Sequence, residues 1–136
     1  MPIRILVVDD RPIVRHGLKA LLKAYPEWEI VDEAEDGLEA VEKAERMKPD
    51  VIVLDVSMPI MNGLEACRQI RKIVPEAEVV IVTQHDSPQM MREARGAGAR
   101  GYVSKSNVVR DLLLAVVAAS QHRFFPSPAH GAGASE

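Results

Sequence analysis

Residues 50–59 contain the feature that most constrains the fold, an apolar run that stops abruptly at a carboxylate. The run at 51–54, Val-Ile-Val-Leu, has the length and β-branched content of a buried strand, and Asp55 follows it directly. In an open parallel α/β sheet, ligands bind beyond the carboxyl ends of the strands. An acid at that position is therefore placed for chemistry, and we take Asp55 as the predicted functional centre.

Three further strand candidates also lead to side chains that can take part in a reaction. These candidates and the residues that follow them are 3–8 with Asp9 and Asp10, 78–82 with Thr83, and 101–104 with Lys105. Because the carboxyl ends of parallel strands lie at one edge of a sheet, these side chains are expected beside Asp55. The sequence therefore predicts three acids, a hydroxyl and an ammonium group at one edge.

Helical patterns lie between the strand candidates. Pro12 suits the first turn of a helix that continues to Tyr25 and ends before Pro26. A cap residue with glutamate three positions later, at Asp36 and again at Asn62, marks the start of two more helices. The remaining elements expected are an edge strand at 28–33, a helix at 87–97, and a last helix from Ser106 or Asn107 to about Ser120. The pattern is five strand–helix units with a tail, which is typical of an α/β protein.

Composition indicates one globular domain. The chain has 136 residues, of which 47% are hydrophobic and 27% charged, as is usual for a domain of this size. A net charge of −3 offers no basic surface to a nucleic acid. Cys67 is the single cysteine, which excludes an intramolecular disulfide, and no segment reaches membrane-spanning length. We therefore expect a cytoplasmic protein without a membrane contact.

The predicted acidic cluster favours a metal ion and phosphoryl chemistry. Three neighbouring carboxylates repel one another, so they need a cation between them or raised pKa values. A site made only of oxygen ligands suits Mg²⁺. A carboxylate such as Asp55 attacks phosphorus to form an acyl phosphate when cations and donors meet the charge on the transferring oxygens. Lys105, Thr83 and Mg²⁺ would supply them, and no acid–base histidine is required.

Together these features resemble the response-regulator receiver domain of two-component signalling over roughly residues 3 to 121. The motifs that carry the resemblance are the acidic pair Asp9-Asp10, Asp55 with Met58-Pro59-x-Met61-x-Gly63, Thr83, and Tyr102-x-x-Lys105. The resemblance implies a CheY-like, flavodoxin-like (βα)5 fold with a five-stranded parallel sheet in the order 2-1-3-4-5 and helices on both faces. It implies a signalling domain rather than an enzyme, with at most self-phosphorylation from small donors and autodephosphorylation.

The resemblance also implies a role for each motif residue. Asp55 would accept a phosphoryl group from a sensor histidine kinase or a phosphotransfer protein, and Lys105 would contact that group. The implied Mg²⁺ ligands are Asp9, Asp10, Asp55 and, through its backbone carbonyl, Ser57. The implied switch pair is Thr83 and Tyr102.

Within the family, the chain looks most like the NarL/FixJ type, transcription factors with a C-terminal helix-turn-helix domain. The segments that carry this likeness are Val-Arg-x-Gly-Leu at 14–18, Tyr-Val-Ser-Lys at 102–105, and Phe-Phe-Pro-Ser-Pro at 124–128. We therefore expect a receiver domain at 1–121 and a linker-like, flexible tail at 122–136. Transcription would be controlled through a DNA-binding domain that these 136 residues do not contain.

Two positions depart from the family pattern. Ser106 follows the lysine where many receivers have proline. Gln84 follows Thr83 where the family usually has a smaller residue, and together with His85 it is expected to crowd the phosphate and the path of attacking water.

Three other functions were weighed against this one. A phosphohydrolase with an aspartyl nucleophile usually has a second acid two residues later, where this chain has Ser57. A dinucleotide-binding module needs a glycine-rich turn after the first strand, where this chain has acids at Asp9 and Asp10. A stand-alone receiver that signals by protein contact keeps the fold without the DNA-binding output.

The last predicted helix has no polar residue at 112–119. The apolar stripe that such a helix needs to cover a sheet is provided by Val109, Leu112, Val116 and Ala119. Leu114 and Ala118 then point away from the sheet. We expect these two residues at a homodimer or partner contact that phosphorylation shifts through the switch pair.

Overall fold

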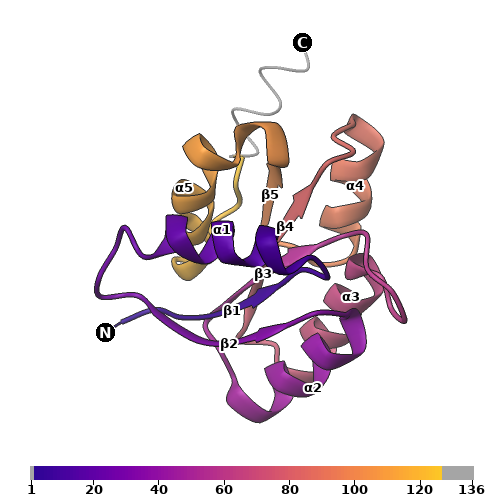
Figure 1. Ribbon diagram of the computed structural model, residues 1–136. Helices are drawn as coiled ribbons and strands as arrows, with labels where there is room; N and C mark the ends of the chain where they lie inside the picture. The colour runs from indigo at the N-terminus through magenta and orange to yellow at the C-terminus, as the bar shows by residue number, and fades with distance from the viewer. Residues whose placement is uncertain (1, 127–136) are drawn as a thin grey trace.

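Five parallel strands form a single sheet in the order β2-β1-β3-β4-β5, with a helix after each strand (Figure 1). The computed structural model describes residues 2–126. The elements are β1 (Arg4–Val8), α1 (Pro12–Leu22), β2 (Glu29–Ala34), α2 (Gly37–Met47), β3 (Val51–Asp55), α3 (Gly63–Ile73), β4 (Glu78–Thr83), α4 (Pro88–Gly96), β5 (Gly101–Ser104), the 3₁₀ turn η1 (Lys105–Asn107) and α5 (Val108–Ser120). This order confirms the predicted (βα)5 class.

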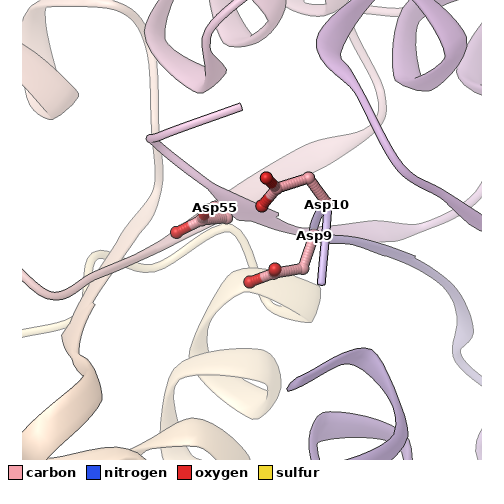
Figure 2. A group of neighbouring side chains, drawn as sticks. All are labelled: Asp9, Asp10 and Asp55. Atoms are coloured by element: carbon pink, nitrogen blue, oxygen red, sulfur yellow. The ribbon is translucent and has the colours of Figure 1, made fainter. Parts of the chain in front are cut away.

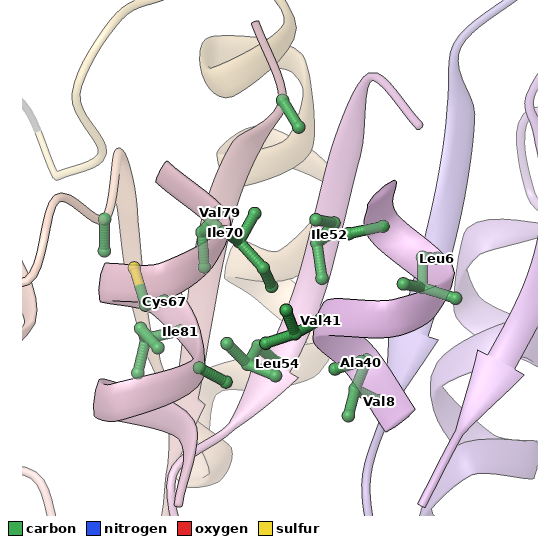
Figure 3. Close-up of a cluster of buried hydrophobic side chains, with 14 of the residues drawn as sticks. Leu6, Val8, Ala40, Val41, Ile52, Leu54, Cys67, Ile70, Val79 and Ile81 are labelled. Carbon is green, nitrogen blue, oxygen red and sulfur yellow. The ribbon is translucent and has the colours of Figure 1, made fainter. Parts of the chain in front are cut away.

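Each face of the sheet is covered by helices, so the central strands are buried on both sides. Alternate residues of β1, β3 and β4 point to opposite faces: Leu6 and Ile52 lie in the core beneath α2 and α3, whereas Ile5 and Val53 lie in the core beneath α1 and α5. Figure 3 shows the first of these two cores, including Cys67. Burial raises the pKa of the Cys67 thiol to about 12, so this cysteine is an inert core residue, as predicted.

Two helix starts are capped as the sequence predicts, but the first helix is shorter than predicted. Asp36 accepts a hydrogen bond from the backbone N–H of Glu39 at 2.8 Å, and Asn62 caps α3 in the same way. The prediction that α1 reaches Tyr25 is wrong, because α1 ends at Leu22. The residue before a proline is disfavoured in the helical conformation. Tyr25 therefore lies in a turn, where its ring packs at a tilt of 57° against Trp28 with centroids 4.3 Å apart.

The predicted apolar stripe of α5 is correct except at its first turn. The buried residues of α5 are Leu112, Ala115, Val116 and Ala119. Val109 was expected in the stripe but is 74% exposed. The first turn of α5 begins where β5 has already ended, and Val109 borders a groove facing Val14 and Leu18 of α1. Helical periodicity predicts the face on which a side chain lies, but not where the sheet beneath it stops.

After α5 the chain turns back along the sheet. The backbone of Phe125 pairs with β5 in a short parallel bridge at Gly101. The division predicted at residue 121 stays a prediction, because residues 127–136 of the expected tail lie outside the described residues. Across residues 2–126, no helix is both long enough and apolar enough to cross a membrane.

Candidate functional site

Three carboxylates meet at the carboxyl edge of the sheet because β1 and β3 are adjacent strands (Figure 2). Asp9 and Asp10 follow β1, and Asp55 is the last residue of β3. One oxygen from each of the three residues lies within 4.8 Å of the others. Asp9 and Asp55 are buried, whereas Asp10 is half-buried. The convergence expected from the strand ends is therefore present.

Lys105, which follows the edge strand β5 at the same carboxyl edge, neutralises part of this charge. It lies in the 3₁₀ turn that follows β5, and its Nζ is 3.1 Å from Asp55 Oδ1 and 3.2 Å from Asp9 Oδ2. Ser104 holds the turn, because its side chain accepts a hydrogen bond from the backbone N–H of Ser106. The lysine predicted from the sequence thus bridges the two buried acids.

Asp55 remains undercompensated despite this contact. Burial raises the pKa of its carboxyl group, and the charge of Asp9 raises it further, while Lys105 and more weakly Arg11 lower it. Its Oδ2 atom is buried and has no hydrogen-bond partner among residues 2–126. A buried polar atom without a partner is costly and often marks a functional position. One oxygen of Asp55 is therefore paired with a cation, and the other is available for a ligand.

Two arginines that the sequence prediction missed hold Asp9 in place. The backbone N–H of Arg11 donates to Asp9 Oδ1 at 2.9 Å, and its side-chain Nε lies 3.5 Å from the same oxygen. Arg15 Nη1 donates to the backbone carbonyl of Asp9 at 2.7 Å, and Arg15 Nε pairs with Glu33 on β2. The available signal was their position, because Arg11 directly precedes α1 and Arg15 lies on its first turn, next to the acidic pair.

The loop after Asp55 is fixed by two glycines that have no space for a side chain. A Cβ atom on Gly63 would lie 2.1 Å from the backbone oxygen of Asp55, and one on Gly37 would lie 2.1 Å from the backbone oxygen of Met61. The N–H of Gly63 donates to Val56 O at 2.8 Å, and that of Gly37 donates to Met61 O at 3.0 Å. The helices α2 and α3 therefore both start against this loop, which explains the glycine in the motif after Asp55.

An open cavity of about 240 Å³ lies over the carboxylates. Its lining residues are Asp10, Arg11, Asp55, Ser57, Gln84 and His85. Ser57 is thus at the site, as the resemblance implies for a residue that offers a backbone carbonyl. Gln84 and His85 border the same cavity. That they crowd a ligand on Asp55 stays a prediction.

Thr83 and Tyr102 are both joined to the loop between β4 and α4. Thr83 is buried at the end of β4, and its Oγ1 accepts a hydrogen bond from the backbone N–H of His85 at 3.0 Å. The Tyr102 hydroxyl donates to Asp86 Oδ1 at 2.9 Å and accepts from the N–H of Ser87 at 3.3 Å. Burial, reinforced by the charge of Asp86, raises the pKa of Tyr102 to about 12. The two residues therefore hold opposite ends of one four-residue segment, and their switch role stays a prediction.

The residues predicted for an interface lie on a different face from the carboxylates. Leu114 is 55% exposed, and Ala118 is half-buried on the same helix. Leu114 lines a cavity of about 540 Å³ between α5 and α4, together with Tyr102 and Phe124. The orientation away from the sheet is as predicted, and the interface itself stays a prediction.

The cluster has the chemistry of a hard-cation site. All its ligand atoms are carboxylate oxygens, and the unpartnered Oδ2 of Asp55 can take a cation at no cost in existing hydrogen bonds. Mg²⁺ prefers few protein oxygens and retains several waters, which the open cavity beside Asp10 and Asp55 permits. The residues present therefore fit a magnesium ion.

A fold of this topology with an acidic cluster and lysine at the carboxyl edge defines a receiver domain, and comparison with known families agrees. The family model described as "Response regulator receiver domain" matches residues 5–117, so the chain belongs to this family. The protein is similar to the transcriptional regulatory protein DegU of Brevibacillus brevis, with 37% identity over 119 residues, or 88% of this chain and 50% of that protein. It is 40% identical over 114 residues, or 84% of this chain, to 52% of the DNA-binding transcriptional activator DevR/DosR of Mycobacterium tuberculosis.

Solved structures give the same assignment. A two-component response regulator of the LuxR family from Aurantimonas sp. SI85-9A1 superposes with a TM-score of 0.88 and 37% identity, covering 95% of this chain and 92% of that one. The receiver domain of the response regulator NarL from Mycobacterium tuberculosis gives a TM-score of 0.84 and 30% identity, covering 90% of this chain and 98% of that one. The relatives are thus of the NarL/LuxR type, and the chain spans about half the length of the two curated regulators it matches.

Proposed function

We propose that this domain receives a phosphoryl group on Asp55 and passes the signal to an output by changing conformation. The observation that carries the proposal is the close approach of three carboxylates, within 4.8 Å, beside a lysine 3.1 Å from Asp55. Structural acids are usually paired in full, whereas this cluster carries more negative than positive charge. Such an imbalance in an open cavity supports a site for a cation and an incoming phosphoryl group.

The proposed reaction needs no acid–base residue. An oxygen of the Asp55 carboxylate forms a bond to phosphorus, and the bond between phosphorus and the donor breaks, leaving its electron pair on the donor atom. The donor is a phosphohistidine of a sensor kinase or phosphotransfer protein, or a small acyl phosphate. Lys105 balances charge on the phosphoryl oxygens, and the Thr83 hydroxyl donates to one of them.

Mg²⁺ is the cofactor in this proposal. Its ligands would be Asp9, Asp10, Asp55 and the backbone carbonyl of Ser57. When bound, the ion supplies the positive charge that relieves repulsion among the carboxylates and balances the phosphoryl oxygens. The backbone N–H of Arg11 binds the Asp9 carboxylate and Arg15 binds the Asp9 backbone carbonyl, so both fix the position of this ligand.

Intact-mass spectrometry after incubation with acetyl phosphate tests the proposal. With Mg²⁺ the protein should gain one phosphoryl group, which hydroxylamine removes because an acyl phosphate is cleaved by that reagent. Without Mg²⁺, or in the Asp55→Asn variant, the mass should not change. Asp111→Asn is the matched control, because Asp111 lies outside the cluster and pairs with Arg110. Full labelling of Asp55→Asn would contradict the assignment.

For the output, we propose control of transcription through a DNA-binding domain outside these 136 residues. DegU and DevR/DosR are described as a transcriptional regulatory protein and a DNA-binding transcriptional activator, and the chain matches about half of each. A cytoplasmic location follows from this role. Sequencing of the codons after residue 136 tests the proposal: a helix-turn-helix segment would support it, and a stop codon would favour a receiver that acts by protein contact.

We also propose that phosphorylation favours self-association through Leu114 and Ala118. Leu114 is a large apolar side chain with 55% exposure beside an open cavity. Sedimentation should show a dimer of the phosphorylated wild type that Leu114→Glu loses. Ile73→Glu, which changes an exposed apolar residue on α3, should dimerise normally. A wild type that stays monomeric with and without phosphate would exclude this contact.

A further inference from the structure

The four residues Arg123, Phe124, Phe125 and Pro126, here named the strap, lie along the outer edge of the sheet. The N–H of Phe125 donates to Arg100 O at 3.0 Å, and Phe125 O accepts from the N–H of Tyr102 at 2.8 Å. The strap therefore adds one step of parallel pairing to β5, which is otherwise an edge strand. One of the two residues that it contacts through the backbone is Tyr102, and the Tyr102 hydroxyl holds the loop after Thr83.

Two arginines hold the strap from the side of the protein. The guanidinium groups of Arg95 and Arg100 each lie 4.6 Å from the centre of the Phe124 ring. Arg95 also donates to the backbone oxygen of Pro126 at 2.8 Å. Arg100 is anchored separately by Glu78. Arg95 on α4 has no salt bridge within residues 2–126, so the strap supplies its compensating contacts.

Docking of the strap also carries a cost, because Arg95 is partly desolvated. Its Nε is buried and has no hydrogen-bond partner in the described part of the chain, and burial lowers the pKa of its guanidinium. An unpartnered buried donor opposes docking, whereas the cation–π contact and the bond to Pro126 favour it. Release of the strap would hydrate Arg95 and remove the penalty. Desolvation of Arg95 therefore offsets part of the free energy that the backbone hydrogen bonds and the cation–π contacts contribute to docking.

Helix α4 connects this strap to the phosphorylation site. Ala94 is the only fully buried residue of α4, so few core contacts fix the position of the helix. Ser87 caps its N-terminus and donates its backbone N–H to the Tyr102 hydroxyl. The C-terminal turn of α4 contains Arg95. Val82 is paired with Asp55, and the next residue, Thr83, holds the start of the loop. A phosphoryl group on Asp55, as proposed above, would offer new acceptors to the Thr83 hydroxyl and would thereby shift the loop that Thr83 holds, and α4 with it.

We infer that the strap is a two-state element, docked when Asp55 is free and released when Asp55 is phosphorylated, with α4 as the connection. The inference rests on the proposed function of Asp55. Coupling of this kind is reciprocal, so releasing the strap must also strengthen the binding of a phosphoryl analogue at Asp55. Through the strap, phosphorylation of Asp55 would change the direction in which the chain leaves the domain at Pro126, the last described residue.

Hydrogen exchange of backbone amides, followed by NMR on the whole chain, tests the forward direction. The amides of Tyr102 and Phe125 both donate hydrogen bonds between β5 and the strap. Phosphorylation by acetyl phosphate with Mg²⁺ should accelerate their exchange at least about fivefold, the lower end of typical coupling, while the amide of Val53 in the core stays unchanged. Intact mass of the same sample gives the extent of phosphorylation. Full labelling with unchanged exchange overturns the coupling alone, whereas an absence of labelling overturns the proposed function and the coupling with it.

The reverse direction is tested with Phe124→Leu, which removes the ring beneath both arginines. Its Phe125 amide should exchange rapidly without phosphate, and its affinity for beryllofluoride with Mg²⁺, a non-covalent phosphoryl analogue, should rise at least about fivefold. Tyr25→Leu is the matched control, because Tyr25 and Phe124 are aromatic residues with the same 37% exposure. An equal beryllofluoride affinity in wild type and Phe124→Leu, with the strap released in the variant, overturns the inference.

Discussion

Buried acids lie at both ends of the sheet, but the two ends treat them differently. At the carboxyl edge, Asp9 and Asp55 share Lys105, and burial together with mutual repulsion raises the pKa of Asp55. At the amino edge, Glu78 opens β4 and is equally buried. Its partners are Arg71 at 3.5 Å, Arg100 at 3.3 Å and His122 at 2.6 Å. Burial alone would raise the pKa of Glu78, but these partners lower it.

The difference separates structural acids from reactive ones. Three basic side chains from α3, the start of β5 and the end of α5 converge on Glu78, so its charge joins elements of the fold. The carboxyl edge has more acids than cations, and an oxygen of Asp55 has no partner in the described part of the chain. Charge at the amino edge should therefore contribute to stability, and charge at the carboxyl edge should oppose it until a ligand binds.

The largest expected effect is at Glu78. Glu78→Gln keeps the shape but leaves Arg71 and Arg100 without their carboxylate, so the free energy of unfolding should fall by about 2–4 kcal/mol. Denaturant titration measures the change. Glu29→Gln is the control, because Glu29 also opens a strand but is exposed, and it should change stability by less than about 0.5 kcal/mol. Equal effects of the two substitutions would remove the contrast between the two edges.

Part of the same contribution should disappear in acid. The folded pKa of Glu78 lies below its ordinary value of 4.5, so the unfolded chain takes up a proton first as the pH falls. The stability contributed by Glu78 is complete above about pH 4.5 and is lost as the pH falls through the lower folded pKa. The stability difference between wild type and Glu78→Gln should therefore shrink over this window in a series of denaturant titrations. A stability difference that grows on acidification would mean that the folded pKa of Glu78 is raised above its ordinary value, not lowered.

A smaller effect of opposite sign is expected at the carboxyl edge. Asp10→Asn removes one of the repelling charges, so the free energy of unfolding in magnesium-free buffer should rise by about 1 kcal/mol. Mg²⁺ at ten times its Kd should stabilise the wild type by about 1.4 kcal/mol and stabilise the variant less. Thermal unfolding with and without Mg²⁺ measures both. A destabilised variant in the absence of metal would mean that Asp10 is a structural acid like Glu78.

The smallest effect is expected at Arg11, whose side chain is 42% exposed. Arg11→Ala removes a cation from the mouth of the cavity, so the rate of labelling by acetyl phosphate should fall about two- to fivefold, and less in high salt. Arg11→Lys keeps the charge and should retain most of the rate. A loss in both variants that is independent of salt would assign Arg11 a packing role.

The sequence predicts the charged edge well because the end of each strand can be recognised locally, and parallel strands bring all their ends to one edge of the sheet. Once β1, β3 and β5 are recognised as parallel strands, Asp9, Asp55 and Lys105 must lie at the same edge. Arg15 was missed because its partner is a backbone carbonyl, for which no side-chain motif exists. Glu78 was missed as a buried acid because two of its three partners, Arg100 and His122, come from distant parts of the chain.

Local composition failed most clearly where tertiary contacts decide the structure. Phenylalanine and proline after α5 indicate no regular element, yet the N–H of Phe125 binds Arg100 O because β5 offers an open edge there. Val109 fits an apolar stripe by periodicity but lies where the sheet has ended. For Phe125 the missing information is that β5 is the edge strand of the sheet. For Val109 it is that β5 consists of only four residues.

The contact between Tyr25 and Trp28 determines what an optical signal from this protein can report. Trp28 is the only tryptophan, and it precedes β2 at the amino edge of the sheet. The acidic cluster lies one strand length away, roughly 15 Å by the usual rise per residue. Indole emission should therefore follow opening of the turn between α1 and β2, giving a clear unfolding transition and almost no response to Mg²⁺ or phosphate. A tryptophan substituted at exposed Ile60, in the loop after Asp55, would provide the optical reporter that the natural indole does not.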